Sequence, residues 1–168
     1  MIKLRETTTA YLLNGSDILL MKRADSRKFA PGVWAGVGGH VEPNELNNPY
    51  ATCVREIFEE TGIQINQIEN LTLRYIVLRR SQSEIRLQYV YFGDTNCRDI
   101  IDTEEGKLYW IDKNHLFDRQ LSVTSRLSLE YYLSNNQSNG IMVGTVFAVD
   151  STPRMNWCPV QDWEGLAK

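Results

Sequence analysis

Runs of β-favouring hydrophobic residues, separated by polar turns, recur along the chain and predict a fold in which strands dominate. The first two runs, Thr7–Leu13 and Asp17–Met21, flank Asn14-Gly15-Ser16, a sequence typical of a hairpin turn. The other predicted strands are Leu71–Arg80, Glu84–Phe92, Lys107–Ile111 and Ile141–Val149. The first two of these are expected to form a second hairpin.

One helix is bounded by clear start and stop signals. Asn48 is a good N-cap residue, and Pro49 suits the first helical position, where its missing N–H costs nothing. Gly62, directly after Thr61, can take the left-handed conformation that ends a helix. The sequence therefore predicts a helix of roughly three turns between Asn48 and Gly62.

Hydrophobic residues at a spacing of three to four predict the buried face of this helix. They are Tyr50, Val54, Ile57 and Phe58. A second helix, at about Val123–Leu133, has a packing stripe made by Val123, Leu127 and Tyr131. Two helices packed against a mixed, curved sheet predict an α/β/α sandwich of three layers.

Composition narrows the class of protein. The chain has 168 residues, 42% of them hydrophobic, which suits one domain over residues 1–168 with its own core. The polar stretch Ser134–Gly140 is expected to separate the second helix from the last strand. A net charge of −3 argues against a partner that is a nucleic-acid polymer.

Nothing in the sequence indicates a membrane or a secretory route. No apolar run is long enough to span a bilayer, and the N-terminus lacks the pattern of a signal peptide. The three cysteines, Cys53, Cys97 and Cys158, have neither the even number of a disulfide framework nor the spacing of a zinc site. A cytoplasmic protein with reduced thiols is expected.

The polar side of the first helix concentrates negative charge. Glu56 and Glu60 are one turn apart and Glu59 neighbours Glu56, so three carboxylates are expected to converge. Arg55 offsets only part of their repulsion, whereas a divalent cation would turn repulsion into attraction. Carboxylate oxygens in this number suit Mg²⁺ or Mn²⁺. The alternative is a solvated, salt-bridged surface helix.

These residues resemble the signature of the Nudix hydrolases. Every defined position of that signature is supplied by Gly39, Glu45 and the stretch Arg55–Ile63. One departure exists, because nine residues rather than seven lie between Glu45 and Arg55. The two extra residues fall in the loop before the helix cap. The resemblance implies a Nudix-type α/β/α sandwich with a curved mixed sheet and few helices.

The resemblance also implies roles for individual residues. The implied metal ligands are Glu56, Glu60, the backbone carbonyl of Gly38, Glu59 and, as a further or indirect ligand, Glu45. Glu59 could instead orient the attacking water, and whether Glu56 or Glu59 is the general base stays open. Arg55 is expected to orient a glutamate or to form a structural ion pair. Glu105 is a more distant catalytic or metal-binding acid, with a solvated loop carboxylate as its alternative.

Further stretches resemble one subgroup of the family. Leu19–Arg23, Pro31–Trp34 and Glu105–Ile111 are similar to MutT-like nucleoside triphosphate diphosphatases. Arg23 is then a candidate for binding phosphate and Trp34 for packing against the base, the alternatives being a surface cation and a core aromatic. Ala35 stands where some enzymes that sanitise oxidised purines have an asparagine, which weakens the case for 8-oxoguanine selectivity.

The function that follows is Mg²⁺-dependent hydrolysis of a nucleoside triphosphate, ordinary or oxidised (8-oxo-dGTP type), to monophosphate and pyrophosphate. The expected partner is a small-molecule nucleotide, and a homodimer is an open expectation. One alternative is a Nudix enzyme acting on a nucleotide sugar, ADP-ribose or a dinucleoside polyphosphate. Another is a nucleotide-sensing module that keeps the fold without turnover.

Overall fold

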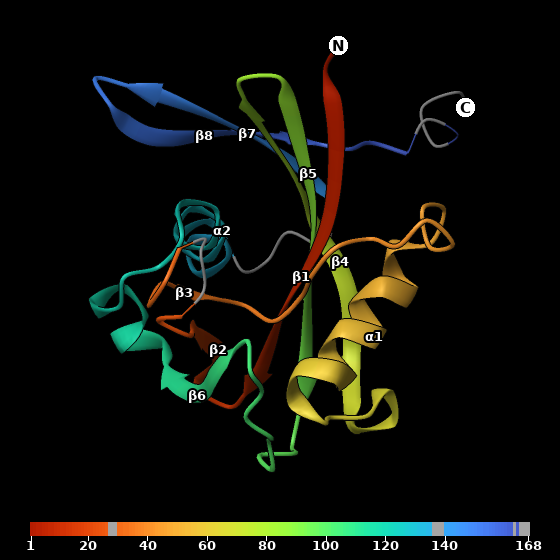
Figure 1. Cartoon of the computed structure of the whole chain (residues 1–168), viewed down its shortest axis with the longest axis vertical. Coiled ribbons are helices and arrows are strands. Elements are labelled where there is room, and N and C mark those ends of the chain that lie inside the picture. Colours follow the sequence, from red (N-terminus) through yellow and green to blue (C-terminus); the bar gives the residue numbers. More distant parts are fainter. Residues whose placement is uncertain (27–29, 136–139, 163, 165–168) are drawn as a thin grey trace.

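The computed structural model describes residues 1–26, 30–135, 140–162 and 164. Figure 1 shows long strands at the centre with a helix on either side. The strands are β1 (Lys3–Asn14), β2 (Asp17–Arg23), β3 (Trp34–Ala35), β4 (Ile68–Ser81), β5 (Glu84–Thr95), β6 (Gly106–Asp112), β7 (Met142–Val149) and β8 (Thr152–Pro159). The helices are α1 (Pro49–Thr61) and α2 (Val123–Ser134), with the 3₁₀ helices η1 (Ile65–Gln67) and η2 (Lys113–Asp118).

The strands form one mixed sheet. Its order is β3-β2-β1-β5-β4-β7-β8, and β6 pairs with β2. The β1–β5 and β4–β7 pairs are parallel and the others antiparallel. Two register shifts between β4 and β5 increase the local twist of the sheet. The predicted fold class, a mixed sheet with few helices, is confirmed.

Two hydrophobic cores lie on opposite faces of this sheet. Alternate residues of β1 divide between them, since Tyr11 and Leu13 belong to the core that includes Leu129 of α2. Leu12 belongs to the other core, with Ile57 of α1. We call these the α2 face and the α1 face. The predicted three layers are therefore present, and Figure 1 shows the helices on the two sides.

The boundaries of α1 agree with the prediction. The side chain of Asn48 accepts a hydrogen bond from the backbone of Ala51. Gly62 has a φ of 78° and donates its N–H to the carbonyl of Phe58. Both ends of the helix are thus capped by the residues whose types predict it.

The predicted buried face of α1 is wrong at two positions. Tyr50 and Phe58 are 43% and 53% exposed, although Ile57 is buried. The face turned to the sheet instead buries Thr52 and Glu60, two polar residues. A hydrophobic pattern cannot reveal this orientation, because hydrogen bonds satisfy those polar groups inside the protein.

The predicted stripe of α2 is confirmed only in part, since Tyr131 packs against the core of the α2 face but Val123 does not. Val123 is 38% exposed, and the buried residues of the helix are Ser125, Ser128 and Leu129. Ser125 lies beside the hydroxyl of Tyr11 on β1, so a small polar residue lies at the contact with the sheet. None of the helices in the described part of the chain is long and apolar enough to cross a membrane.

The sequence assigned no structure to the segment that forms β8. This strand pairs with β7 along its whole length and ends the sheet. Pro153 and Pro159 argue against a central strand, but an edge strand tolerates proline. Of the stretch predicted as a turn before β7, residues 136–139 lie outside the described residues.

Candidate active site

Arg55 of α1 holds most of the predicted glutamates together. Its Nε and Nη2 donate to the two carboxylate oxygens of Glu45, each over 2.9 Å. Its Nη1 donates to Glu56 over 2.9 Å and to Glu59 over 3.0 Å. Nη2 also donates to the carbonyl of His40, 3.1 Å away. One guanidinium therefore fixes three glutamates and the loop in front of them.

Glu45 lies in the site despite the two extra loop residues. It is buried and also accepts hydrogen bonds from the hydroxyl of Thr52 (2.8 Å) and the backbone of Glu42 (3.2 Å). The bond from Arg55, reinforced by these two, lowers the pKa of Glu45 to about 2 against the effect of burial. With both oxygens engaged, Glu45 is better placed to position Arg55 than to bind a cation directly.

Glu60 is the most deeply buried acid of α1. Only 5% of it is exposed, and one carboxylate oxygen accepts the backbone N–H of Gly38 over 2.7 Å. Burial raises its pKa to about 8, and the negative charges of Glu56 and Glu105 act in the same direction. Gly38 and Arg23 oppose this effect only in part. Glu60 is thus a buried acid with too little positive charge around it.

Glu56 is intermediate in burial between the exposed Glu59 and the buried Glu60. Burial raises its pKa, Arg55 lowers it, and the charges of Glu59 and Glu105 raise it again. Glu59 points to solvent, with 55% of its side chain exposed. Among the described residues, no three His, Cys, Asp or Glu side chains lie close enough to hold a metal ion. The predicted convergence of Glu56, Glu59 and Glu60 on one point is therefore not found.

Gly39 leaves the space that the Glu56 carboxylate fills. A Cβ atom built on Gly39 would overlap that carboxylate, whereas the backbone itself is unstrained. We expect Gly39→Ala to displace Glu56 and to reduce turnover roughly 10-fold, because a misplaced ligand or base acts less efficiently. The free energy of unfolding should change by less than about 1 kcal/mol, since a flexible carboxylate can move aside.

Steady-state kinetics and urea unfolding of the Gly39→Ala variant would test this expectation. Gly140→Ala is the matched control, because a Cβ there meets nothing within 4 Å. Equal turnover in the two variants would contradict a role for the close contact between Gly39 and Glu56.

The pairing of β2 with β6 brings Arg23 and Glu105, which are far apart in the sequence, towards the glutamates. Arg23 is opposite Gly106, and the backbone of Ala24 donates to the carbonyl of Glu105 over 3.0 Å. Both Arg23 and Glu105 act electrostatically on Glu60. The Nε of Arg23 is buried and has no hydrogen-bond partner within the described ranges. The structure thus brings these predicted site residues close to Glu60.

Trp34 occupies β3 and is partly buried against the core of the α2 face. Its ring lies 5.1 Å from that of Tyr109, and the guanidinium of Arg119 lies 5.5 Å from its centre. These contacts give the side chain a packing role, and they leave its contact with a base as a prediction.

Arg5 contributes to the site although nothing in the sequence marks it. Its Nη1 donates to the Nε2 of His40 over 3.0 Å, and its Nε pairs with Glu84. An arginine has no acceptor, so Nε2 is the acceptor in this contact. The loop is thus held at His40 by Arg5 from one side and by Arg55 from the other. The contact becomes apparent only in the folded chain, where Thr7 pairs with His40.

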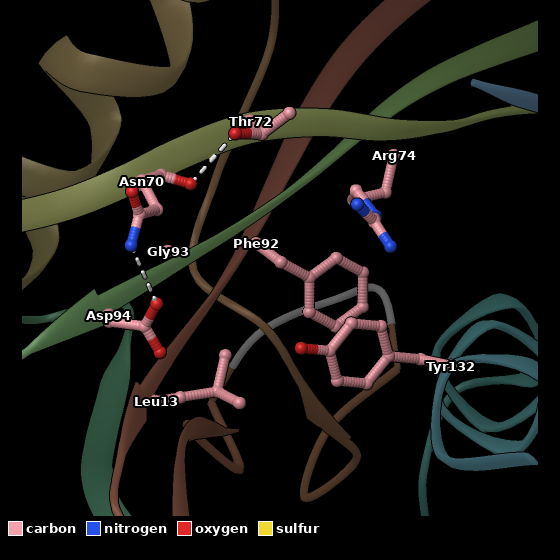
Figure 2. A pocket seen from close by; sticks show the side chains of 8 residues that line it. All are labelled: Leu13, Asn70, Thr72, Arg74, Phe92, Gly93, Asp94 and Tyr132. Carbon is pink, nitrogen blue, oxygen red and sulfur yellow. Dashed lines mark hydrogen bonds between the residues drawn. The ribbon is translucent and has the colours of Figure 1, made fainter. Parts of the chain in front are cut away.

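A small pocket of about 210 Å³ lies elsewhere on the molecule (Figure 2). It is lined by Leu13, Asn70, Thr72, Arg74, Phe92, Gly93, Asp94 and Tyr132. Its lining includes neither the glutamates nor Arg55 nor the residues Gly38, Gly39 and His40.

A comparison with protein families gives the glutamate site its context. The sequence model of the NUDIX domain matches residues 3–131, more than half of the chain. This chain belongs to the Nudix hydrolase family. As a Nudix hydrolase it is an enzyme that acts on phosphoanhydrides, and Nudix hydrolases generally use divalent metal ions. Strands β7 and β8 lie outside the matched residues but continue the same sheet.

Individual relatives refine this assignment. Nucleoside triphosphatase NudI of Salmonella paratyphi B is 34% identical over 125 residues, which cover 69% of this chain and 87% of that protein. The MutT protein of Bacillus halodurans has a TM-score of 0.69 at 19% identity, covering 90% of this chain and 97% of that one. A MutT NUDIX hydrolase from Burkholderia pseudomallei has a TM-score of 0.64 at 26% identity, covering 76% and 97%. This Nudix hydrolase is therefore MutT-like.

Proposed function

We propose that this Nudix hydrolase cleaves nucleoside triphosphates to a nucleoside monophosphate and pyrophosphate, with Mg²⁺ or Mn²⁺ as cofactor. The observation that carries the proposal is the buried carboxylate of Glu60 beside Gly38, on which Arg23 and Glu105 act electrostatically. A candidate phosphate-binding cation, Arg23, and a candidate metal-binding acid, Glu105, thus both influence a second such acid, Glu60. The nucleoside triphosphatase relative supports the choice of substrate class.

The donor groups at this place suit a hard divalent cation. The carboxylates of Glu56, Glu60 and Glu105, with the carbonyl of Gly38, are oxygen ligands of the kind that Mg²⁺ prefers. Of these acids Glu60 is buried, and its pKa is raised by burial and, to a smaller extent, by the charges of Glu56 and Glu105. When bound, the metal ion would neutralise phosphoryl oxygens and lower the pKa of a coordinated water.

The residues of the chain have separate roles in the proposed reaction. Arg23 would bind a phosphate of the substrate through its guanidinium. Glu56 or Glu59 would accept the proton of the attacking water, and Arg55 would hold both in place. Glu45 would fix Arg55 in turn, as a positioning residue. Trp34 remains the candidate for packing against the base.

A substrate panel tests the proposal. The purified protein would be incubated with Mg²⁺ and matched ordinary and oxidised nucleoside triphosphates, ADP-ribose, a nucleotide sugar and a dinucleoside polyphosphate, and the products separated chromatographically. We expect monophosphate and pyrophosphate from a triphosphate, and no turnover once EDTA removes the metal. Because Ala35 lacks a side-chain amide, we expect no preference for the oxidised purine.

Other outcomes would redirect the proposal. Turnover of only ADP-ribose or another diphosphate would move the enzyme to a different substrate class. Nucleotide binding without any turnover would support the sensor alternative. The cytoplasmic location and the homodimer stay predictions, for which fractionation and the mass of the protein in solution are the measurements.

A further inference from the structure

Three arginines from neighbouring strands lie in one row across the sheet. Arg5 of β1 is in register with Arg86 of β5, which is opposite Arg79 of β4. Side chains alternate between the faces of a strand, and Val77 of β4 and Val90 of β5 belong to the core of the α2 face. The three arginines therefore lie on the α2 face.

The three arginines of the row differ in their ion pairs. The carboxylate of Glu84 pairs with both Arg5 and Arg86. Arg79 has no ion pair with any residue in the described part of the chain, and its Nε is buried there without a hydrogen bond. Burial lowers the pKa of Arg79, the charge of Arg86 lowers it further, and the charge of Glu84 opposes both effects. Like charges directly opposite each other are destabilising, so this arrangement costs stability in the free protein.

One end of the row lies beside the loop that carries Gly38, Gly39 and His40. Arg5, at one end, contacts His40, whose neighbour Gly39 lies against Glu56. Arg79, at the other end, is two strand spacings away, about 10 Å. In Figure 1 the start of β1 and the tip of the β4–β5 hairpin extend past α2, so that helix does not cover this part of the face. A nucleotide with its phosphates at the glutamates of α1 would reach the row on the α2 face by extending past His40 and Arg5.

We propose that Arg79 and Arg86 form a substrate subsite that binds oxygen acceptors of the nucleotide, either phosphate oxygens or base carbonyls. The unpartnered Nε of Arg79 and the planar fork of a guanidinium suit such acceptors, which would also relieve the repulsion between the two arginines. The subsite selects among nucleotides and takes no part in bond cleavage. This inference rests on the proposed nucleoside triphosphatase function.

The test compares Arg79→Gln with Arg80→Gln. Arg80 is the next residue of β4 and is exposed on the opposite face, so its substitution removes the same charge without touching the subsite. For the preferred triphosphate, KM of the Arg79→Gln variant should rise about 10-fold with kcat unchanged, the equivalent of one lost charge-assisted hydrogen bond. Arg80→Gln should match the parent. Arg79→Lys keeps the charge but loses the planar guanidinium, so its KM should lie between those of the two glutamine variants.

Binding measured without turnover separates the two kinds of acceptor. In EDTA, calorimetry would compare a non-hydrolysable triphosphate analogue with inorganic tripolyphosphate. Weaker binding of both ligands to Arg79→Gln assigns the contact to phosphate, and weaker binding of the analogue alone assigns it to the base. Equal KM and equal affinity in the two glutamine variants would overturn the inference while the parent still hydrolyses triphosphates. A parent that neither binds nor hydrolyses any triphosphate would overturn the proposed function, and the inference with it.

Discussion

The Glu60→Gln variant should lose at least about 1000-fold in turnover at saturating Mg²⁺, because a metal ion at a phosphoryl centre supplies several kcal/mol. Glu60 is the acid that the fold buries most deeply beside Gly38 and Arg23. A neutral amide keeps an oxygen for the N–H of Gly38 but loses the charge that attracts a cation. The free energy of unfolding should stay level or rise, since a buried charge is removed.

Activity and urea unfolding must be measured together for Glu60→Gln. The control is Glu130→Gln on α2, where the replaced carboxylate is 45% exposed and forms only a surface ion pair with Arg126. Near-normal Mg²⁺-dependent turnover in Glu60→Gln would remove Glu60 from the metal site. A large loss of stability would assign it a structural role instead.

The sequence predicted most elements of the fold because their signals are local. The caps of α1, Asn48 and Gly62, act through hydrogen bonds to residues within one turn. The orientation of α1 depends on contacts that form only in the folded protein. Glu60 is buried because Gly38 donates to it, whereas Phe58, which a hydrophobic pattern places inside, is exposed.

The residues of the candidate site also fall into two groups: those that local sequence reveals and those that only the folded structure brings together. Glu56, Glu59 and Glu60 could be found from their spacing on a helix. Arg79 and Arg86 could not, because they become neighbours only through the register of β4 with β5. Register is set by the whole sheet and is not readable from either strand alone.

Positive charge is distributed unequally between the acids that pair with Arg55 and the buried Glu60. Arg55 is shared among Glu45, Glu56 and Glu59, so one positive charge serves three acids. Among the described residues, the groups that favour the charged form of Glu60 are the backbone N–H of Gly38 and the more distant Arg23. The positive charge of Arg55 is therefore concentrated at the exposed side of the helix, whereas the buried side has no comparable counter-charge in the described part of the chain and is where a cation gains most from binding.

Removing Arg55 should have the largest effect on stability. We expect Arg55→Ala to lower the free energy of unfolding by about 3 kcal/mol, because it leaves a buried carboxylate without its partner. Turnover should fall as well, since Glu56 and Glu59 lose the group that holds them. Urea unfolding measures the first effect. Arg98→Ala, which breaks an exposed ion pair with Asp17, should cost less than about 1 kcal/mol and serves as the control.

A second substitution identifies why Arg55→Ala lowers the free energy of unfolding. If the unpaired charge of Glu45 destabilises Arg55→Ala, then adding Glu45→Gln should recover part of the lost free energy, because an amide needs no counter-charge and still accepts from Thr52. A double variant as unstable as the single one would assign the loss to the packing of the Arg55 side chain. An Arg55→Ala protein within about 1 kcal/mol of the parent would show that Glu45 does not depend on Arg55.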